Sequence, residues 1–492
     1  MFYDILSIAE SLRRDGATAL IVGGAVRDLL LGQVPKDFDI EVYGIASLDE
    51  LQKHLSRFGC VAQVGKSFGV LKLHTQRATY NVSLPRIERK VAKGHKGFAV
   101  RCDADLSFEQ AAKRRDFTIN AMGYDPIDAV MYDPYGGQED LQRKVLRHTD
   151  DATFIEDPLR VYRAVQFAAR FELSVDTTTA ALCRRMVRER MLDELPKEQV
   201  FEELKKLLLQ APRPSQGFEL MREWGITKRY FPELDALIDI PQDFRYHPEG
   251  DVWVHTMMAL DAMQKLCRSC ESGNPHADKK DEKRHLTLMY AVLCHDLGKP
   301  STTTLELQNG ASLPWCDAKA KAILSDDPSA VARIRAIGHE KAGIEPTRRL
   351  LARITNKYKW IESILPYVRH HLKPAQFYRN GARAGAIRRL ARKVEIPSLV
   401  LVAKADFLGR TTLEAKTGRF EAGEWLLAQA KALEVHDAPH KPLLQGRDLV
   451  AMGLKPSPRF KELLDAVFEA QLDGKVVRKD DAIEYVKRLI GG

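Results

Sequence analysis

The stretch VGGAVRDLLLGQVPKDFDIE, residues 22–41, decides the fold that we expect for the amino-terminal part of this chain. It starts at the end of an apolar, strand-like run, residues 19–22, and passes through Gly23 and Gly24. Because glycine has no side chain, the backbone here can approach a phosphate closely. A helix-prone segment, residues 25–31, follows and ends at Gly32. The order of strand, glycine pair and helix predicts a phosphate-binding turn.

A second predicted strand follows Pro35, and its side chains alternate between apolar and acidic. The apolar face carries Phe38, Ile40 and Val42, and the acidic face carries Asp37, Asp39 and Glu41. Two carboxylates at this spacing repel each other unless a cation neutralises them, and such oxygen ligands suit Mg²⁺ bound together with substrate phosphates. An acid pair alone is more often a solvated surface strand. Beside the glycine pair and Arg27, it predicts metal-assisted phosphoryl or nucleotidyl transfer, with Asp37 and Asp39 binding Mg²⁺.

Three further motifs follow in order along the chain. They are KRRDFTINAM at residues 113–122, DPYGGQEDL at residues 133–141 and EDPLRVYRAVQFAARF at residues 156–171. Together with residues 22–41, they resemble the class II tRNA nucleotidyltransferases and bacterial poly(A) polymerases of the polymerase β superfamily, and specifically the bacterial CCA-adding type. The resemblance implies an α+β fold in which a nucleotidyltransferase head with a mixed sheet precedes an all-α neck, a helical HD domain and a small helical carboxyl-terminal segment.

The resemblance also implies a nucleotide site. By this likeness Gly24, Arg27, Arg115 and Arg163 hold the incoming nucleotide. Relatives often carry a third acid where this chain has Asn81, so we base the Mg²⁺ site on the aspartate pair alone.

Asp157 and Arg160 are three residues apart in a segment, residues 157–171, that we expect to be helical. Cytosine and adenine both present an amino donor beside a ring-nitrogen acceptor, which a carboxylate next to a guanidinium matches. Guanine and uracil reverse this pattern. An aspartate–arginine pair at this spacing is usually a surface ion pair, but within the motif EDPLR we expect it to select CTP and ATP.

A second set of ligand-type residues lies in the later, helix-rich part of the chain. It comprises His255, His295, Asp296 and Asp406, with His339 and the His370–His371 pair as additional candidates. In this order the set resembles the HD phosphohydrolases, whose imidazole and carboxylate ligands suit Mn²⁺, Ni²⁺, Fe²⁺ or Zn²⁺ better than Mg²⁺ alone. The resemblance leaves two alternatives open: hydrolysis of nucleotide phosphates, or a helical scaffold that holds RNA.

Length and composition limit the other classes of protein. A chain of 492 residues with 45% hydrophobic and 29% charged residues is typical of several globular domains. We expect them at residues 1–145 (catalytic head), 146–240 (neck with the templating helix), 241–415 (HD domain) and 416–492 (carboxyl-terminal segment). No apolar run approaches the roughly 18 residues needed to span a bilayer. The start of the chain lacks a basic signal-peptide region, and its seven cysteines are scattered, so we expect a cytoplasmic protein.

The net charge of +9 permits a polyanionic partner, and its distribution favours RNA. Basic residues gather in three places, residues 184–190, 333–359 and 388–393. A lone Cys267–Cys270 pair has no second pair at zinc-finger spacing. We further expect loops at residues 85–105, 271–284 and 307–328.

These observations favour a CCA-adding enzyme acting on tRNA with CTP and ATP, with no DNA or membrane partner and an oligomeric state that the sequence leaves open. A poly(A) polymerase, or an enzyme adding only CC or only A, shares the head motifs. An HD phosphohydrolase with an RNA-binding head is the alternative from another class.

Overall fold

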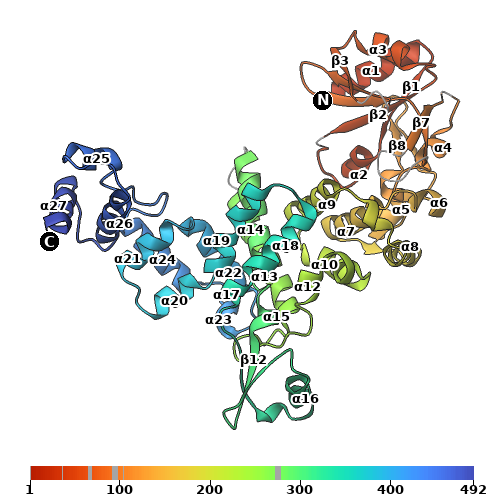
Figure 1. Ribbon diagram of the computed structural model, residues 1–492. Coiled ribbons are helices and arrows are strands. Elements are labelled where there is room, and N and C mark those ends of the chain that lie inside the picture. Colours follow the sequence, from red (N-terminus) through yellow and green to blue (C-terminus); the bar gives the residue numbers. More distant parts are fainter. Residues whose placement is uncertain are drawn as a thin grey trace. The chain divides into compact units, whose positions relative to one another are not determined.

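The computed structural model describes residues 2–35, 37–64, 69–90, 98–103, 105–271 and 279–491 (Figure 1). The contacts within it divide the chain into two compact units. Unit 1 comprises Met1–Pro212 and Gln216–Ile226, and unit 2 comprises Arg213–Ser215 and Thr227–Gly492. The finer four-part division that the sequence suggests stays a prediction. At the coarser level the expected α+β class is confirmed, since a mixed sheet is followed by a mostly helical body.

A seven-stranded mixed sheet forms the base of unit 1, in the order β3-β4-β5-β2-β1-β8-β9. Its strands are β1 (Thr18–Val22), β2 (Phe38–Tyr43), β3 (Cys60–Val64), β4 (Val70–His74), β5 (Thr79–Ser83), β8 (Gly123–Asp125) and β9 (Val130–Tyr132). The central strand β2 pairs antiparallel with β1 and parallel with β5. The glycine turn and the acid pair therefore lie on the two neighbouring strands at the middle of the sheet.

The apolar face of β2 is buried as its alternation predicts. Phe38, Ile40 and Val42 pack in one cluster with Ile8 of helix α1 (Phe2–Arg14) and Leu51 of helix α3 (Leu48–Leu55). Helix α1 places its apolar residues on one side because they recur at helical spacing. This core fixes which face of β2 carries the acids.

Glu41 differs from the row of solvated acids that the alternation predicts. Its side chain is fully buried. Its two oxygens accept from Nη2 of Arg114 at 2.8 Å and from Nη2 of Arg115 at 3.4 Å, and the hydroxyl of Tyr43 donates to it at 3.1 Å. Burial alone would raise the pKa of Glu41, but the two guanidinium groups lower it, so the buried carboxylate stays charged. Only Asp37 and Asp39 of the three acids are exposed.

The predicted loop at residues 85–105 is partly a β-hairpin. Strands β6 (Arg86–Lys90) and β7 (Phe98–Cys102) pair antiparallel, so the expectation of a loop is wrong for these residues. Residues 91–97 and 104 lie outside the described part of the chain.

Short elements and then helices complete unit 1. They are α2 (Gly24–Leu30), α4 (Phe108–Ala112), η1 (Thr118–Asn120), α5 (Gly137–Gln142), β10 (Val145–Leu146), α6 (Asp151–Phe154), α7 (Leu159–Phe171), β11 (Ser174–Val175), α8 (Thr177–Arg188), η2 (Met191–Glu194), α9 (Lys197–Gln210) and α10 (Ser215–Glu223). Helices α7 and α9 pack against each other within this unit.

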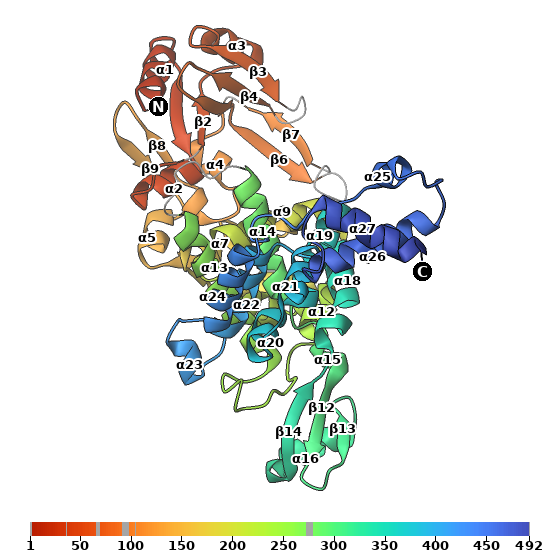
Figure 2. The same cartoon turned by 90° about the vertical axis from the view of Figure 1, so that its left-hand side faces the viewer.

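Unit 2 is mostly helical (Figure 2). Its helices are α11 (Ile226–Tyr230), α12 (Pro232–Asp235), α13 (Val252–Glu271), α14 (Lys279–Cys294), α15 (Lys299–Thr302), α16 (Ala318–Asp326), η3 (Pro328–Ala330), α17 (His339–Ala342), α18 (Ile344–Ile354), α19 (Tyr358–His370), α20 (Lys373–Arg379), α21 (Ala384–Ala391), α22 (Ile396–Leu408), α23 (Leu413–Lys416), α24 (Glu421–Ala432), α25 (Gly446–Ala451), α26 (Arg459–Leu472) and α27 (Lys479–Gly491). Helix α13 packs on α14 and α22, which brings three distant stretches of sequence side by side.

Two predicted loops of unit 2 contain regular structure. Strands β12 (Thr303–Leu307), β13 (Ser312–Pro314) and β14 (Val331–Ala336) form a three-stranded sheet beside α16, which we call the β-arm (Figure 2). The expected loop at residues 307–328 is therefore wrong for β13 and α16. Residues 279–284 of the other expected loop belong to α14, and residues 272–278 lie outside the described residues. No helix among the described residues is both long and apolar enough to cross a membrane.

We expect the change Glu41→Gln to destabilise unit 1 by about 3 kcal/mol, because it leaves two guanidinium groups beside a buried neutral amide. Hydrogen exchange should accelerate in peptides covering β1 and β2. Glu10→Gln, an exposed change on α1, should leave exchange there unaltered. Equal protection in the Glu41 variant and the unaltered protein would contradict the account of this ion pair.

Candidate functional site

A cavity of about 500 Å³ in unit 1 brings the predicted motifs together. Its lining residues are Gly23, Gly24, Arg27, Asp39, Arg115, Asp116, Asn120, Asp157, Leu159, Arg160, Arg163, Gln166, Phe167, Arg170, Lys206 and Gln210. Every predicted site residue of the head except Asp37 lines it. Asp37 lies in the exposed bend just before β2. Residues up to 187 positions apart in sequence, Gly23 and Gln210, thus surround one space with both acidic and basic groups.

The sequence suggests that the two glycines make room for a phosphate. In the structure they also make room for two arginine side chains. Gly23 has a φ of 73°, and a Cβ there would lie 2.8 Å from Nη1 of Arg115. A Cβ on Gly24 would lie 3.3 Å from Nη2 of Arg27. The absence of both side chains therefore lets two guanidinium groups lie against the turn.

Asp39 lies where strands β2 and β5 pair, directly opposite Asn81. The amide nitrogen of Asn81 donates to Oδ1 of Asp39 at 3.0 Å. At the position where the resemblance leads us to expect a third acid, the chain therefore has a neutral group that donates a hydrogen bond to Asp39. The exposed carboxylates of Asp37 and Asp39 supply the hard oxygen donors that a divalent cation requires, so the residues present fit Mg²⁺.

A buried polar network joins three of the motifs. Arg27 pairs with Asp28 at 2.6 Å and donates from Nη1 to Oδ1 of Asn120 at 2.5 Å. Asn120 donates to Asp116 at 3.0 Å, and Asp116 accepts from Nε of Arg163 at 2.7 Å. Burial favours the neutral form of Asp116, but Arg163 and the amide of Asn120 lower its pKa. The carboxylate therefore fixes one arginine directly and the other through an amide.

Helix α7 begins later than the sequence predicts. It starts at Leu159 after the N-cap residue Pro158, so Asp157 precedes the helix instead of belonging to its first turn. Oδ1 of Asp157 accepts from the backbone nitrogen of Leu159 at 3.0 Å. Arg160 donates to the carbonyl oxygens of Thr153 at 2.8 Å and Arg114 at 2.6 Å. Both members of the predicted base-selecting pair thus have orientations set by backbone groups.

The HD-type residues of unit 2 form a buried cluster, which we call the His/Asp cluster. His255 of α13 lies 3.1 Å from Oδ1 of Asp406 on α22, measured from Nε2. His295 and Asp296 follow α14, and Nε2 of His295 lies 3.2 Å from Oδ2 of Asp296. Both of these atoms are buried; Nε2 of His295 makes no hydrogen bond to a described residue, whereas Oδ2 of Asp296 also lies 2.7 Å from Nζ of Lys299. A cation bound between these imidazole and carboxylate groups would satisfy them, so the donor set fits a divalent transition metal.

Of the additional histidines, His339 and His371 join the cluster and His370 does not. Nε2 of His339 lies 3.3 Å from Oδ1 of Asp296 and 3.2 Å from Nε2 of His371. Asp296, His339 and His371 form one potential ligand group, and His255, His295 and Asp296 form another. Asp296 is shared by both.

Cations balance the charge of the buried acids. Lys299 lies 2.7 Å from Asp296, and Arg410 lies 3.0 Å from Asp406. Burial tends to raise the pKa values of both acids, but the charges of His295 beside Asp296 and of Arg410 beside Asp406 hold them well below the usual range. Burial lowers the pKa of His371 to about 3, so this imidazole is neutral and can donate a lone pair to a metal.

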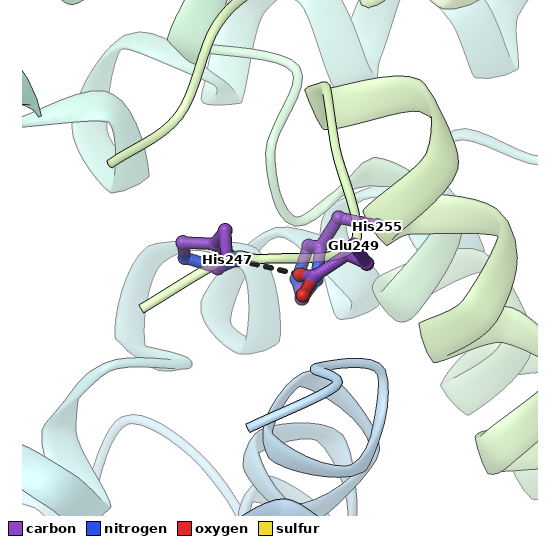
Figure 3. A group of neighbouring side chains, drawn as sticks. All are labelled: His247, Glu249 and His255. Carbon is purple, nitrogen blue, oxygen red and sulfur yellow. Dashed lines mark hydrogen bonds and ion pairs between the residues drawn. The ribbon is translucent and has the colours of Figure 1, made fainter. Parts of the chain in front are cut away.

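Figure 3 shows a histidine–carboxylate group that our sequence reasoning missed. Oε1 of Glu249 lies 2.9 Å from Nδ1 of His247 and 2.8 Å from Nδ1 of His255. The carboxylate thus orients the ring of His255 so that its Nε2 faces the His/Asp cluster. The motif HPEGDVWVH contains all three residues, and its closely spaced histidines and glutamate were the available signal.

The predicted basic clusters do not all form free surfaces. Arg389 pairs with Glu469 and Asp473 of the carboxyl-terminal segment, at 2.7 and 2.6 Å, and Arg388 donates to the carbonyl of Leu472. Arg353 pairs with Glu233 at 3.0 Å. These arginines therefore join helical parts of unit 2, an outcome that sequence spacing could not distinguish from phosphate binding.

Comparison with known proteins places the chain in a family. It is 35% identical over 429 residues to the protein named multifunctional CCA protein of Pasteurella multocida (strain Pm70), and the match covers 85% of this chain and 89% of that protein. This chain belongs to the multifunctional CCA protein family. The family member of Burkholderia pseudomallei (strain K96243) is 35% identical over 465 residues, covering 92% of this chain and 96% of the relative.

Domain models and solved structures agree with this family. Residues 19–147 match the model described as poly A polymerase head domain, and residues 172–238 match the model described as probable RNA and SrmB-binding site of polymerase A. The solved Bacillus stearothermophilus CCA-adding enzyme in complex with CTP has a TM-score of 0.65 at 20% identity, covering 100% of this chain and 98% of its own. The Thermotoga maritima CCA-adding enzyme complexed with tRNA has a TM-score of 0.56 at 20% identity, covering 98% of this chain and 94% of its own. At this identity the structural likeness speaks for the fold.

The change Asp116→Asn should destabilise unit 1 in a pH-dependent way. Because the folded-state pKa of Asp116 is lowered, its charge contributes stability above the ordinary value of 3.8, and this contribution is lost as the pH falls through the lowered value. The free energies of unfolding of the variant and the unaltered protein should therefore differ at pH 7 and converge below pH 3.8. Urea unfolding at a series of pH values measures this difference, and a gap that stays constant across the series would refute the ion-pair account.

Proposed function

We propose that this chain adds CCA to the 3′ end of tRNA by template-independent, Mg²⁺-dependent nucleotidyl transfer from CTP and ATP, releasing pyrophosphate. The observation that carries the proposal is the unit 1 cavity, where Asp39, the glycine turn, Arg115, Asp157, Arg160 and Arg163 line one space. The relatives named multifunctional CCA protein support it, since their likeness extends over most of the chain. A cytoplasmic location accords with this substrate.

In the proposed reaction the 3′-hydroxyl of the RNA attacks the α-phosphorus of the nucleotide. A P–O bond forms to the RNA, the bond to pyrophosphate breaks, and the hydroxyl proton leaves to solvent. Asp37 and Asp39 would hold Mg²⁺, which when bound lowers the pKa of the attacking hydroxyl and neutralises charge on the triphosphate. Arg27, Arg115 and Arg163 orient the nucleotide phosphates and sugar through their guanidinium groups.

Base selection is assigned to Asp157 and Arg160. The carboxylate accepts from the exocyclic amino group that cytosine and adenine share, and the guanidinium donates to the neighbouring ring nitrogen. Arg160 already donates to two backbone carbonyls, which hold its planar group in one orientation. Orientation by the backbone supports a protein-borne template.

The helical parts of the chain are assigned to RNA binding, by charge and shape. Residues 172–238 match a model described as a probable RNA-binding site, and the basic stretch at residues 184–190 lies within them. We propose addition of the complete CCA sequence in preference to the activity of a poly(A) polymerase or of an enzyme that adds only CC or only A. Supplying CTP alone to a tRNA lacking its 3′ end separates them, because an enzyme specific for ATP adds nothing.

The His/Asp cluster supports a second activity, hydrolysis of phosphoesters in unit 2. The buried side chains of His295 and Asp296 would hold a transition metal such as Mn²⁺ or Ni²⁺ together with His255 and Asp406. Such a metal, when bound, supplies a nucleophilic water and neutralises phosphate charge. The two activities would use separate acid sets in separate units.

Substitution of one residue in each unit separates the two activities. Asp39→Ala should lower incorporation of labelled CTP roughly a thousandfold or more, because one of the two metal-binding carboxylates is lost, and it should leave phosphoester hydrolysis unchanged. His295→Ala should do the reverse. If His295→Ala removed CTP incorporation and Asp39→Ala did not, the head would be an RNA-binding module and the proposal would fail.

The changes Asp157→Ala and Arg160→Ala should relax base selection. A hydrogen-bonded pair of this kind discriminates by about 1–3 kcal/mol, so misincorporation of UTP relative to CTP should rise roughly 5- to 150-fold. Sequencing the extended 3′ ends measures the ratio. Glu156→Ala is the matched control, since Glu156 adjoins Asp157 but does not line the cavity. If both variants still selected CTP over UTP as the unaltered protein does, residues other than Asp157 and Arg160 would select the base.

A further inference from the structure

A second cavity, of about 490 Å³, opens from the His/Asp cluster and has two chemically different ends. Its inner end is buried and includes Asp296, His339, His371 and Asp406. Its outer end is lined by Tyr246, Arg335, Ile337 and Arg379, of which Tyr246 is 61% exposed and Ile337 75% exposed. The cavity therefore runs from a potential metal site to the surface of unit 2.

The β-arm builds one wall of the outer end. Ile334, Arg335 and Ala336 of β14 line the cavity together with Thr303 of β12. Nε of Arg335 lies 3.2 Å from Glu306 on the paired strand β12, which holds the arginine stem in place. The remaining nitrogens of this guanidinium are the ones that a ligand could reach.

The connection before α13 is fixed to the same strand. Asp243 accepts a backbone hydrogen bond from Ile334, and Arg245 pairs with Asp243 at 2.5 Å and reaches the carbonyl of Ala332 at 3.5 Å. These bonds hold residues 241–248 against β14 and present the ring of Tyr246 at the mouth of the cavity. Strand β14 thus positions both Arg335, which belongs to it, and the ring of Tyr246, whose segment is hydrogen-bonded to it.

The cationic side chains at the inner end have acidic partners, whereas those at the outer end are at least partly free of partners among the described residues. Lys299 and Arg410 at the inner end are occupied by Asp296 and Asp406. Arg379 ends α20, is exposed, and makes no side-chain hydrogen bond or ion pair with the described residues. The outer end therefore offers two guanidinium groups to an anion that lies beyond the buried cluster.

We propose that the outer end of this cavity is a subsite for the penultimate nucleotide of a single-stranded RNA, with Tyr246 stacking on its base and Arg335 and Arg379 binding its phosphate. The terminal phosphoester then lies at the His/Asp cluster. The inference rests on the proposed hydrolytic function of unit 2, and it makes the substrate an RNA end instead of a free nucleotide.

A strand fits this arrangement better than a mononucleotide. Exposed aromatic rings beside arginines are the usual means of binding single-stranded nucleic acid without sequence preference. A mononucleotide placing its only phosphate at the buried cluster would leave Arg335 and Arg379 without an anion. The separation of buried acids and exposed arginines thus matches a chain with two successive phosphates.

The test compares hydrolysis of adenosine 3′-phosphate and of a trinucleotide bearing a 3′-phosphate by the full chain loaded with Mn²⁺. We expect kcat/KM for the trinucleotide to exceed that for the mononucleotide by about tenfold. Tyr246→Ala and the double change Arg335→Ala, Arg379→Ala should each remove this preference and leave mononucleotide hydrolysis unchanged. Phe244→Ala and Arg333→Ala are matched controls, since both residues are exposed neighbours outside the cavity lining and should retain the preference.

Photocrosslinking gives a readout that does not depend on hydrolysis. A trinucleotide 3′-phosphate with 4-thiouridine at its penultimate position should crosslink to the peptide containing Tyr246 and lose this crosslink in the double arginine variant. If neither substrate is hydrolysed but the crosslink forms, the hydrolytic function fails and the subsite stands. Equal kcat/KM for the two substrates, an equal effect of the control changes, or a crosslink only to unit 1 would overturn the subsite.

Discussion

The buried ion pair between Glu41 and the arginines Arg114 and Arg115 is the constraint on which the rest of unit 1 depends. A fully buried carboxylate is tolerated only when cations compensate it, and here the compensation comes from a motif more than seventy residues later in the chain. Since Glu41 is on the same strand as Asp39, the pair fixes the distance between the acid strand and the arginine motif. Arg115 then lies against Gly23, where a Cβ would collide with it. One buried charge thus fixes the relative positions of the acid strand, the arginine motif and the glycine turn around the unit 1 cavity.

Elsewhere in the cavity, too, buried and half-buried polar side chains orient arginines. Asp116, Asn120 and Asp28 bind Arg27 and Arg163 in orientations that leave each guanidinium edge at the cavity lining. If this site binds CTP and ATP as we propose, arginines that are oriented in advance favour binding, because less side-chain entropy is lost. These acids therefore orient the arginines, and the two exposed aspartates stay available for the metal that we propose.

Much of this arrangement could be predicted from the sequence, and the exceptions have physical reasons. Period-2 alternation identified the buried face of β2 correctly, but it treated Glu41 like its exposed neighbours, because alternation reports a face and not what covers it. The helix that carries the proposed base-selecting Arg160 was predicted to begin at Asp157, although Pro158 is its N-cap and the helix starts at Leu159. In unit 2 the order of His255, His295, Asp296 and Asp406 predicted the cluster, whereas His247 and Glu249 were missed because their role depends on a ring orientation that only coordinates reveal. Residues 307–328 of the β-arm were expected to form a loop, because strand β13 has only three residues and is too short to show an apolar alternation.

The two proposed metal sites differ in burial and in the type of ligand that they offer. Asp37 and Asp39 are exposed oxygen donors, which suits a cation that arrives with a triphosphate and leaves with pyrophosphate. The His/Asp cluster is buried, combines imidazole with carboxylate, and has its ligands oriented by Glu249 behind His255 and by Lys299 and Arg410 behind the acids. A resident metal held by oriented ligands can serve substrates that bring little charge of their own, and such substrates must then be recognised by groups further out. The exposed ring of Tyr246 and the arginines of the outer cavity lie where that recognition would be needed.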